Sequence, residues 1–178
     1  MLVPDLEGPA RLRLLEEDDA EELYGLIAAN RERLAHWMAW AAGQTLDGTR
    51  AFIQEVRRQH EAGDGMQTAI VVDGAIAGLV GVHGISWHDG TTSIGYWLGE
   101  RFTGRGLMTQ SVRAYTSAAL RSWGLHRMEL QAAVANAPSR AVAERAGFVL
   151  EGVRHGAQVV GDRRHDLAVY AALATEWR

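Results

Sequence analysis

The sequence predicts an α+β fold of three layers, in which helices pack on both faces of a mixed central sheet of about seven strands. Asp73-Gly74 and Asp89-Gly90 separate three strand-like segments, and such dipeptides are typical of tight hairpins, so this part of the sheet should be antiparallel. A later strand-like segment lies between two helical segments, which supply the crossovers that parallel strands need. With 178 residues, we expect one domain over 1–178.

The first half of the chain predicts one strand, two or three helices and three antiparallel strands. Residues 11–15 alternate between polar and apolar side chains, as in a strand, and an acidic run at 16–19 then begins a helix that extends to about His36. A second helix begins at 47–49 and ends at Gly63. The three strands are expected at 68–72, 75–87 and 92–98.

The second half predicts a long helix, a strand, a short helix and two final strands. Apolar residues recur at helical spacing after Gly106, at Met108, Val112, Tyr115, Ala119 and Trp123. Residues 128–134 alternate as a strand does, and the short helix begins at Pro138 and ends at Gly147. The last strands begin at Phe148 and at Leu167.

Composition excludes several classes of protein. The formal net charge is -4, so a nucleic-acid partner is not expected, although all 18 basic residues are Arg. The chain has no Cys, which excludes disulfides and thiolate catalysis, and its seven His lack metal-site spacing. It shows neither a signal peptide nor a long apolar run. We therefore expect a cytoplasmic protein without a metal or a membrane partner.

The turn at 101–106, Arg-Phe-Thr-Gly-Arg-Gly, joins a buried strand to the long helix. Its glycines allow a ligand to approach the backbone, and the helix N-terminus favours an anion, so the turn predicts a phosphate site. A Walker loop is excluded because the chain has no Lys. A dinucleotide fingerprint almost fits, with Thr109 in place of Gly or Ala, so a dinucleotide-binding module stays as a remote alternative.

The pattern Arg-x-x-Gly-x-Gly of this turn resembles the acetyl-CoA pyrophosphate signature of the GNAT acyltransferases. Four further stretches sharpen the likeness: Ile94-Gly95-Tyr96-Trp97-Leu98, Asn136-x-x-Ser139, Ala146-Gly147-Phe148 with Glu151-Gly152, and His165-Asp166 with Tyr170-Ala171. Together they resemble the RimJ/RimL branch, the ribosomal-protein N-terminal acetyltransferases and their small-molecule relatives. The resemblance covers residues 11–170. It implies the GNAT fold, with a V-shaped splay between the fourth and fifth strands, and acetyl-CoA as the cosubstrate.

The resemblance implies where acetyl-CoA would bind. Backbone N–H groups from Gly104 to Met108 would hold the pyrophosphate, with the side chains of Arg101 and Arg105 nearby. The pantetheine arm would lie between 96–98 and 132–135, and an N–H near Leu98 would polarise the thioester carbonyl. The cofactor residues expected in this way are Leu98, Arg101, Gly104, Arg105, Gly106, Leu107, Met108, Asn136 and Ser139.

The same likeness assigns the chemistry. Ser139 would protonate the leaving thiolate and Asn136 would bind the cofactor arm; the alternative is that both only cap the following helix. The carboxylates that relatives use as a base are replaced here by Gln158 and Ser93. His83 or a chain of waters must then accept the proton of the amine.

The acceptor is expected to lie against Trp37, Trp40, Tyr96 and Gln158, although the segment with both Trp can equally be core packing. The reaction implied is direct attack of a primary amine on acetyl-CoA in a ternary complex, and the leading acceptor is the α-amine of a protein N-terminus, such as that of a ribosomal protein. An antibiotic or polyamine acetyltransferase and a non-catalytic acyl-CoA-binding protein remain alternatives. A homodimer is also considered.

Overall fold

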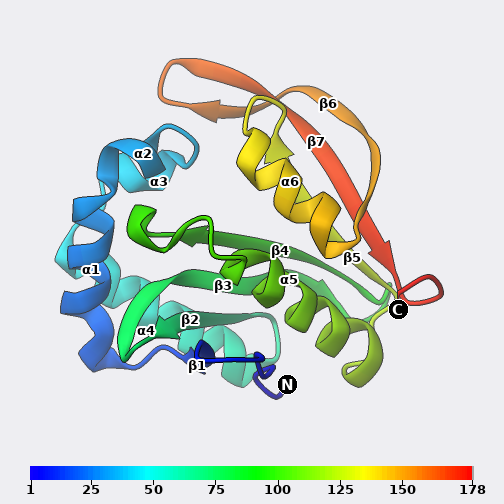
Figure 1. Cartoon of the computed structure of the whole chain (residues 1–178), viewed down its shortest axis with the longest axis horizontal. Coiled ribbons are helices and arrows are strands. Elements are labelled where there is room, and N and C mark those ends of the chain that lie inside the picture. The colour runs from blue at the N-terminus through cyan, green and yellow to red at the C-terminus, as the bar shows by residue number, and fades with distance from the viewer. Residues whose placement is uncertain (178) are drawn as a thin grey trace.

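A seven-stranded sheet in the order β1-β2-β3-β4-β5-β7-β6 forms the centre of the structure, a computed structural model that describes residues 1–177 (Figure 1). Residue 178, the last of the expected domain, lies outside the described residues. The strands are β1 (Arg11–Leu14), β2 (Met66–Val72), β3 (Ala75–Ser86), β4 (Thr91–Leu98), β5 (Arg127–Ala133), β6 (Val149–Val160) and β7 (Arg163–Leu173). Among residues 1–177, only β4 and β5 pair in parallel, so the expected mixed sheet with an antiparallel first half is confirmed.

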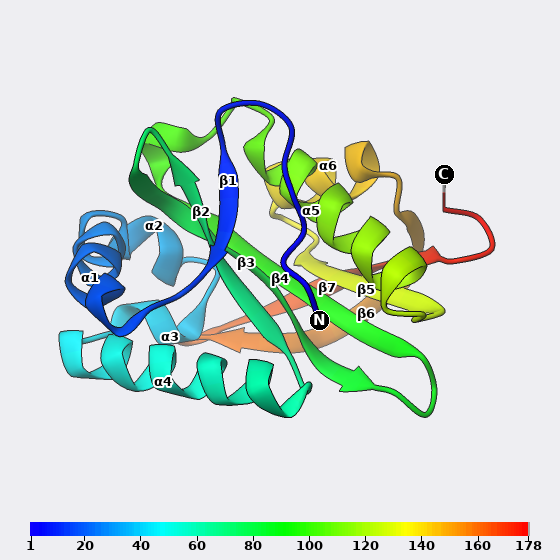
Figure 2. The same cartoon turned by 90° about the horizontal axis from the view of Figure 1, so that it is seen from below.

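Helices cover the two faces of this sheet in separate groups (Figures 1 and 2). One group is α1 (Ala20–Ala29), α2 (Arg31–Ala35), α3 (Ala39–Ala42) and α4 (Leu46–Ala62), and the other is α5 (Leu107–Ser117) and α6 (Ala137–Ala146). Short 3-10 turns span Glu17–Asp19 and Glu100–Phe102, and a π-helical turn at Ala118–Ser122 continues α5. Each face buries its own apolar cluster, with Ile53 and Trp97 in the first and Tyr115 and Leu130 in the second.

The structure corrects two expected boundaries. The helix expected to reach His36 ends at Ala29, because the Asn30 side chain donates to Leu26 O (2.8 Å) and accepts from the N–H of Glu100 (2.8 Å). Asn30 thereby ties the end of α1 to the segment that precedes the glycine turn. The last strand begins at Arg163 rather than at Leu167, so β6 and β7 form a long hairpin that reaches α2 and α3 (Figure 1).

The parallel strands β4 and β5 separate part-way along their length. They pair over four positions only, from Thr91 opposite Arg127 to Ile94 opposite Leu130. Beyond Ile94, β4 continues to Leu98 beside β3, while β5 continues to Ala133 beside β7. This is the V-shaped splay that the resemblance implied, and it opens the sheet between its two halves.

Candidate active site

A cavity of about 860 Å³ opens where β4 and β5 separate. Its lining comes from α2 and the segment after it, the end of β4, the glycine turn, the start of α5, the end of β5, α6 and the β6–β7 hairpin. Three Arg side chains, Arg33, Arg105 and Arg145, contribute to the lining, whereas none of the lining residues, all within 1–177, is Asp or Glu. Such a cavity suits a ligand that carries several negative charges.

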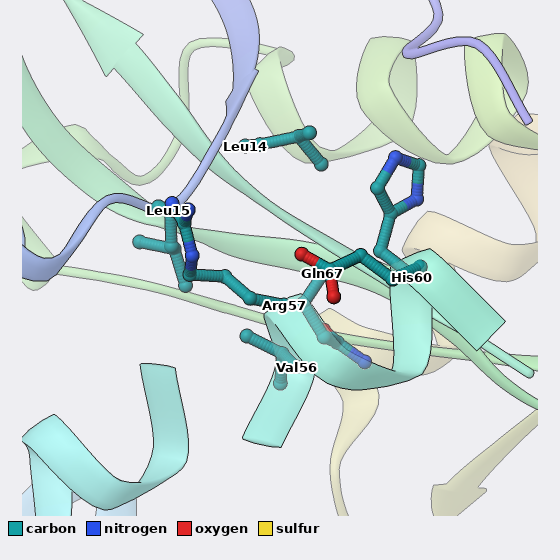
Figure 3. Close-up of a pocket in the computed structure, with 7 residues that line it drawn as sticks. Leu14, Leu15, Val56, Arg57, His60 and Gln67 are labelled. Atoms are coloured by element: carbon teal, nitrogen blue, oxygen red, sulfur yellow. The ribbon is translucent and has the colours of Figure 1, made fainter. Parts of the chain in front are cut away.

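A second pocket lies between α4 and the strands β1 and β2 (Figure 3). Arg57 crosses it and donates to Leu15 O (3.2 Å), and the buried Nδ1 of His60 has no hydrogen-bond partner within the described residues. Its volume of about 90 Å³ equals the space of roughly three water molecules. The larger cavity is therefore the candidate site for a cofactor.

The glycine turn presents backbone N–H groups to this cavity. Gly104 (φ 75°) and Gly106 (φ 76°) both adopt the left-handed conformation that favours glycine. Gly106 is the N-cap of α5, and having no side chain it cannot accept a hydrogen bond from the first N–H groups of the helix. The first hydrogen bond within the helix runs from Gln110 N to Gly106 O (3.0 Å). The N–H groups of Leu107, Met108 and the next residue therefore remain available at the positive end of the helix dipole.

The two Arg residues of the turn differ in position. Both guanidinium groups lie over the Phe102 ring, 4.5 Å from its centroid for Arg101 and 5.8 Å for Arg105. Arg105 also donates to Arg101 O (3.0 Å) and lines the cavity, whereas Arg101 does not line it. The structure therefore places Arg105 at the cavity and Arg101 outside its lining.

The splayed strands form the two walls of the expected pantetheine slot. Residues 96–98 of β4 and 131–133 of β5 line opposite sides of the cavity. Leu98 O accepts a hydrogen bond from Arg33 of α2. This bond fixes the end of β4 to the group of helices α1–α4. Sequence reasoning missed Arg33, because no local pattern relates two residues 65 positions apart.

Ser139 and Tyr96 meet on the α6 side of the cavity. The Oγ atom of Ser139 lies 3.0 Å from the Tyr96 hydroxyl, which also donates to Ser139 O (3.1 Å). Burial raises the pKa of Tyr96 to about 12, so this hydroxyl keeps its proton at neutral pH. Tyr96, expected beside the acceptor, thus directs its hydroxyl toward Ser139 instead.

Asn136 is the N-cap of α6. Its Oδ1 accepts from the N–H of Ser139 (3.2 Å), whereas Ser139 is the third residue of the helix and caps nothing with its hydroxyl. The alternative in which both residues serve only as caps is therefore wrong for Ser139. Both residues line the cavity.

The acceptor is expected where the β6–β7 hairpin meets the segment after α2. This part of the cavity is lined by uncharged side chains. Gln158 Nε2 donates to Trp37 O (3.3 Å), and both residues line the cavity. The Trp37 ring also lies 5.9 Å from that of His165. Trp40, in contrast, lies outside the lining, 43% exposed and 6.2 Å from Trp97 in ring centroids, so its expected place beside the acceptor is not reproduced.

Asp166 shapes the hairpin that carries Gln158. Between Arg154 and Gln158, β6 bulges out of register with β7. The Asp166 carboxylate holds the bulge by accepting from Gly156 N (2.7 Å) and by pairing with His155 Nδ1 (2.9 Å). Those two contacts lower the pKa of Asp166. Gln158, the first residue paired after the bulge, lines the cavity, so Asp166 contributes to its position.

His83 lies at the edge of the cavity rather than in its lining. It pairs with Ser93 across β3 and β4, and its ring covers Gly95, where an added Cβ would lie 3.4 Å from Cε1 of His83. The residue is exposed as a whole, yet desolvation of the ring lowers the pKa of His83 below its ordinary value. At neutral pH the ring is therefore uncharged and able to accept a proton.

Residues 10–149 match the family model described as the acetyltransferase (GNAT) domain. This chain belongs to the GNAT acetyltransferase family. It is 35% identical over 168 residues to the putative ribosomal N-acetyltransferase YdaF of Bacillus subtilis (strain 168), which covers 93% of this chain and 92% of the relative. It is 29% identical to the ribosomal-protein-serine acetyltransferase of Escherichia coli (strain K12), over 91% of each chain.

Solved GNAT structures resemble the whole fold. The structure of RimL, the ribosomal L7/L12 alpha-N-protein acetyltransferase in complex with coenzyme A, superposes with a TM-score of 0.92 at 28% identity, over 97% of this chain and 98% of that one. The microcin C7 self immunity acetyltransferase MccE, in complex with acetyl-CoA and AMP, gives a TM-score of 0.89 at 29% identity, over 94% and 93%. This GNAT protein is an N-acetyltransferase with acetyl-CoA as its cosubstrate.

Two further findings bear on partners. No helix among residues 1–177 is both long and apolar enough to cross a membrane. In the same part of the chain, no group of three or more His, Cys, Asp or Glu side chains is arranged to hold a metal ion.

Proposed function

We propose that this GNAT enzyme transfers the acetyl group of acetyl-CoA to the N-terminal α-amine of a protein, with ribosomal proteins as the substrate class. The observation that carries the proposal is the single cavity that runs from the glycine turn, between β4 and β5, to the uncharged contact of Trp37 with Gln158. The names of YdaF and of the Escherichia coli relative support the acceptor class. A cytoplasmic location is proposed with it, because ribosomal proteins are made there.

In this proposal the N-terminus of α5 holds the pyrophosphate. Its backbone N–H groups and the Arg105 side chain supply donors, and the absence of carboxylates from the cavity lining within 1–177 avoids repulsion. The arm carrying the thioester lies between β4 and β5, where unpaired strand edges offer backbone hydrogen bonds. Asn136, as the cap of α6, stands beside that arm.

Proton transfers follow from the same geometry. The neutral amine attacks the thioester carbonyl, and the thiolate that leaves takes a proton from the Ser139 hydroxyl, which is hydrogen-bonded to the Tyr96 hydroxyl. The proton that the nitrogen loses as the amide forms then restores the Ser139 hydroxyl. An α-amine has a pKa of about 7.7–8.0, so roughly a tenth is already neutral near pH 7. The base therefore needs to be only modest, and neither Gln158 nor Ser93 can serve.

A small amine is the second candidate acceptor. The likeness to MccE favours it. That acetyltransferase of the same fold is named for immunity to microcin C7 rather than for a ribosomal protein, and its structure holds acetyl-CoA together with AMP. The non-catalytic acyl-CoA-binding protein and the dinucleotide-binding module considered from the sequence are not proposed, because the chain belongs to the GNAT acetyltransferase family. The homodimer considered from the sequence stays a prediction that light scattering in solution would test.

The deciding experiment mixes the protein with acetyl-CoA and a panel of amines and follows free thiol release. The panel contains peptides that begin with Ser or Ala, the same peptides blocked at the N-terminus, polyamines and aminoglycosides. We expect release with free peptides only, and mass spectrometry should place one acetyl group on the α-amine. Release with small amines alone would overturn the protein acceptor, and acetyl-CoA binding without release from any amine in the panel would overturn both proposed acceptor classes.

A further inference from the structure

Three polar side chains form a row across the centre of the sheet. Strand register places His83 of β3 opposite Ser93 of β4, and Ser93 opposite Glu129 of β5. Residues in register on adjacent strands direct their side chains to the same face of a sheet. Glu129 is therefore the lateral neighbour of the position at which GNAT relatives carry a carboxylate and this chain carries Ser93.

This row lies on the face that leads into the cavity. Ile94 and Leu130, the next residues along β4 and β5, are buried in the cluster that packs against α5, so Ser93 and Glu129 face the opposite side. Two residues further along the same face stand Gly95 and Gln131, and both line the cavity. The row is thus one strand repeat, roughly 7 Å, from the cavity lining.

The charge around Glu129 is unbalanced. Arg127 Nη2 donates to Glu129 Oε1 (2.8 Å) and to Glu151 Oε2 (2.5 Å), so one cation serves two carboxylates. Hydrogen bonds to Glu151 and Glu129 raise the pKa of Arg127, which stays charged. The three groups carry a net charge of about -1, which attracts a protonated amine and becomes neutral when one carboxylate takes up a proton.

The other strands contribute one charge near this row, that of Arg154. On β7, Ala171 stands opposite Glu129 and is neutral. Arg154 of β6 donates to Gln131 Oε1 (3.3 Å), and Gln131 lies two residues after Glu129 on the same face of β5. On the β3 side, His83 is uncharged at neutral pH because desolvation lowers its pKa. The Glu129 side chain is 31% exposed, so a proton that it accepts can return to solvent.

We propose that Glu129 accepts the proton of the acceptor amine through a bridging water, and so supplies from β5 the carboxylate that β4 lacks at Ser93. The step is balanced: the ammonium N–H bond breaks, the proton moves through the water to the carboxylate, and the neutral amine retains the electron pair that attacks the thioester carbonyl. This inference rests on the proposed acetyl transfer and adds the group that prepares the amine.

The test compares Glu129→Gln with Glu151→Gln, because each removes one carboxylate from the same Arg127. We expect Glu129→Gln to lower kcat/KM at pH 7 on the order of 10²-fold, with the deficit shrinking above pH 8 as the amine loses its proton unaided. Glu151→Gln should lower kcat/KM less than Glu129→Gln does, because it reduces the negative charge that attracts the amine but leaves the proton acceptor in place. Acetyl-CoA affinity should be unchanged in both. Adding Ser93→Glu to Glu129→Gln should recover most of the lost activity at pH 7.

Equal losses in the two variants, or wild-type activity in Glu129→Gln, would overturn the role of Glu129 while leaving the proposed function intact. A wild-type protein that binds acetyl-CoA but acetylates no amine would overturn both. Should Glu129→Gln fail to fold, Glu129→Asp carries the test, since it keeps the charge for Arg127 and shortens the side chain. It should still lower kcat/KM at pH 7, and unchanged kinetics in a folded Glu129→Asp would count against the proposal.

Discussion

At the scale of single residues, Asn136 has a structural role and leaves Ser139 free for a chemical one. Asn136 binds the N–H of Ser139 and so satisfies the N-terminus of α6, which leaves the Ser139 hydroxyl to Tyr96. Because burial raises the pKa of Tyr96 to about 12, the Tyr96 hydroxyl stays protonated at neutral pH and remains hydrogen-bonded to Ser139. A hydroxyl that is not needed as a cap is free to serve as an acid.

Replacing Ser139 with Ala should therefore cost activity rather than stability. We expect turnover to fall by roughly 10²-fold while acetyl-CoA affinity changes little. Asn136→Ala is the comparison, because it removes the cap and should lower the free energy of unfolding by about 1 kcal/mol. Steady-state kinetics, calorimetry with acetyl-CoA and urea denaturation measure the three quantities. A Ser139→Ala protein with full turnover would exclude Ser139 as the acid.

His83 offers a second test at this scale. Its ring lies over Gly95 outside the cavity lining, so we expect His83→Ala to keep most of kcat/KM and the rise of rate toward pH 8. A pH–rate profile with one good peptide measures this. Desolvation lowers the pKa of His83, so its limb would lie below pH 6.5. If wild type shows such an acidic limb and it disappears in His83→Ala, then His83 is the base, and the water route to solvent or to Glu129 is wrong.

At the scale of elements, the N-terminus of α5, the proposed pyrophosphate site, depends on Gly106. An added Cβ on Gly106 meets no atom within 4 Å, so the position faces open space, where the proposed pyrophosphate lies. A side chain there would both occupy that space and strain the left-handed backbone. The helix thus depends on a residue without a side chain to present its N–H groups.

Gly106→Val should weaken acetyl-CoA binding by at least about 10-fold, since the side chain displaces the phosphate from its donors. Gly124→Val is the matched control: Gly124 has φ 75°, an added Cβ there also meets nothing within 4 Å, and the residue does not line the cavity. Both variants carry the same backbone strain, and only the first should lose affinity in calorimetry. Equal affinities would remove the turn from the binding site.

At the scale of the whole molecule, three groups link the stability of the fold to pH. Burial lowers the pKa of both His60 and His83, so the folded state favours their neutral forms. Asp19 is buried too; burial alone would raise its pKa, but the Arg13 guanidinium (2.6 Å) and Glu16 N–H outweigh burial and lower it. Each of these three groups therefore has a lower pKa in the folded chain than in the unfolded chain.

Stability should therefore fall on acidification in two stages. The histidines lose their contribution as pH falls below their unfolded pKa of about 6.5, and Asp19 loses its contribution as pH falls below about 4. Urea denaturation at pH 7.5 and 5.5 isolates the first stage. The double variant His60→Gln with His83→Gln should show a smaller decrease between these two pH values than wild type, and an identical decrease would contradict the assignment.

The sequence by itself determined the local units of this protein. Hairpin dipeptides and helical periodicity identify strands and helices, and the glycine turn predicts a phosphate site, because each depends on residues that are neighbours in the chain. The GNAT resemblance, built on such local stretches, was confirmed by the family match and by the splay of β4 and β5. The positions of Trp40 and Arg101 were not foreseen, because exposure depends on how elements pack.

Tertiary structure alone decided which groups meet. Tyr96 reaches Ser139 across 43 residues, Gln158 reaches Trp37 across 121, and Glu129 stands beside Ser93 only through strand register. A shift of one residue in that register would turn Glu129 to the other face of the sheet. Register, the point of strand separation and the bulge at Asp166 are set by packing of the whole sheet, and no local pattern in the sequence contains them.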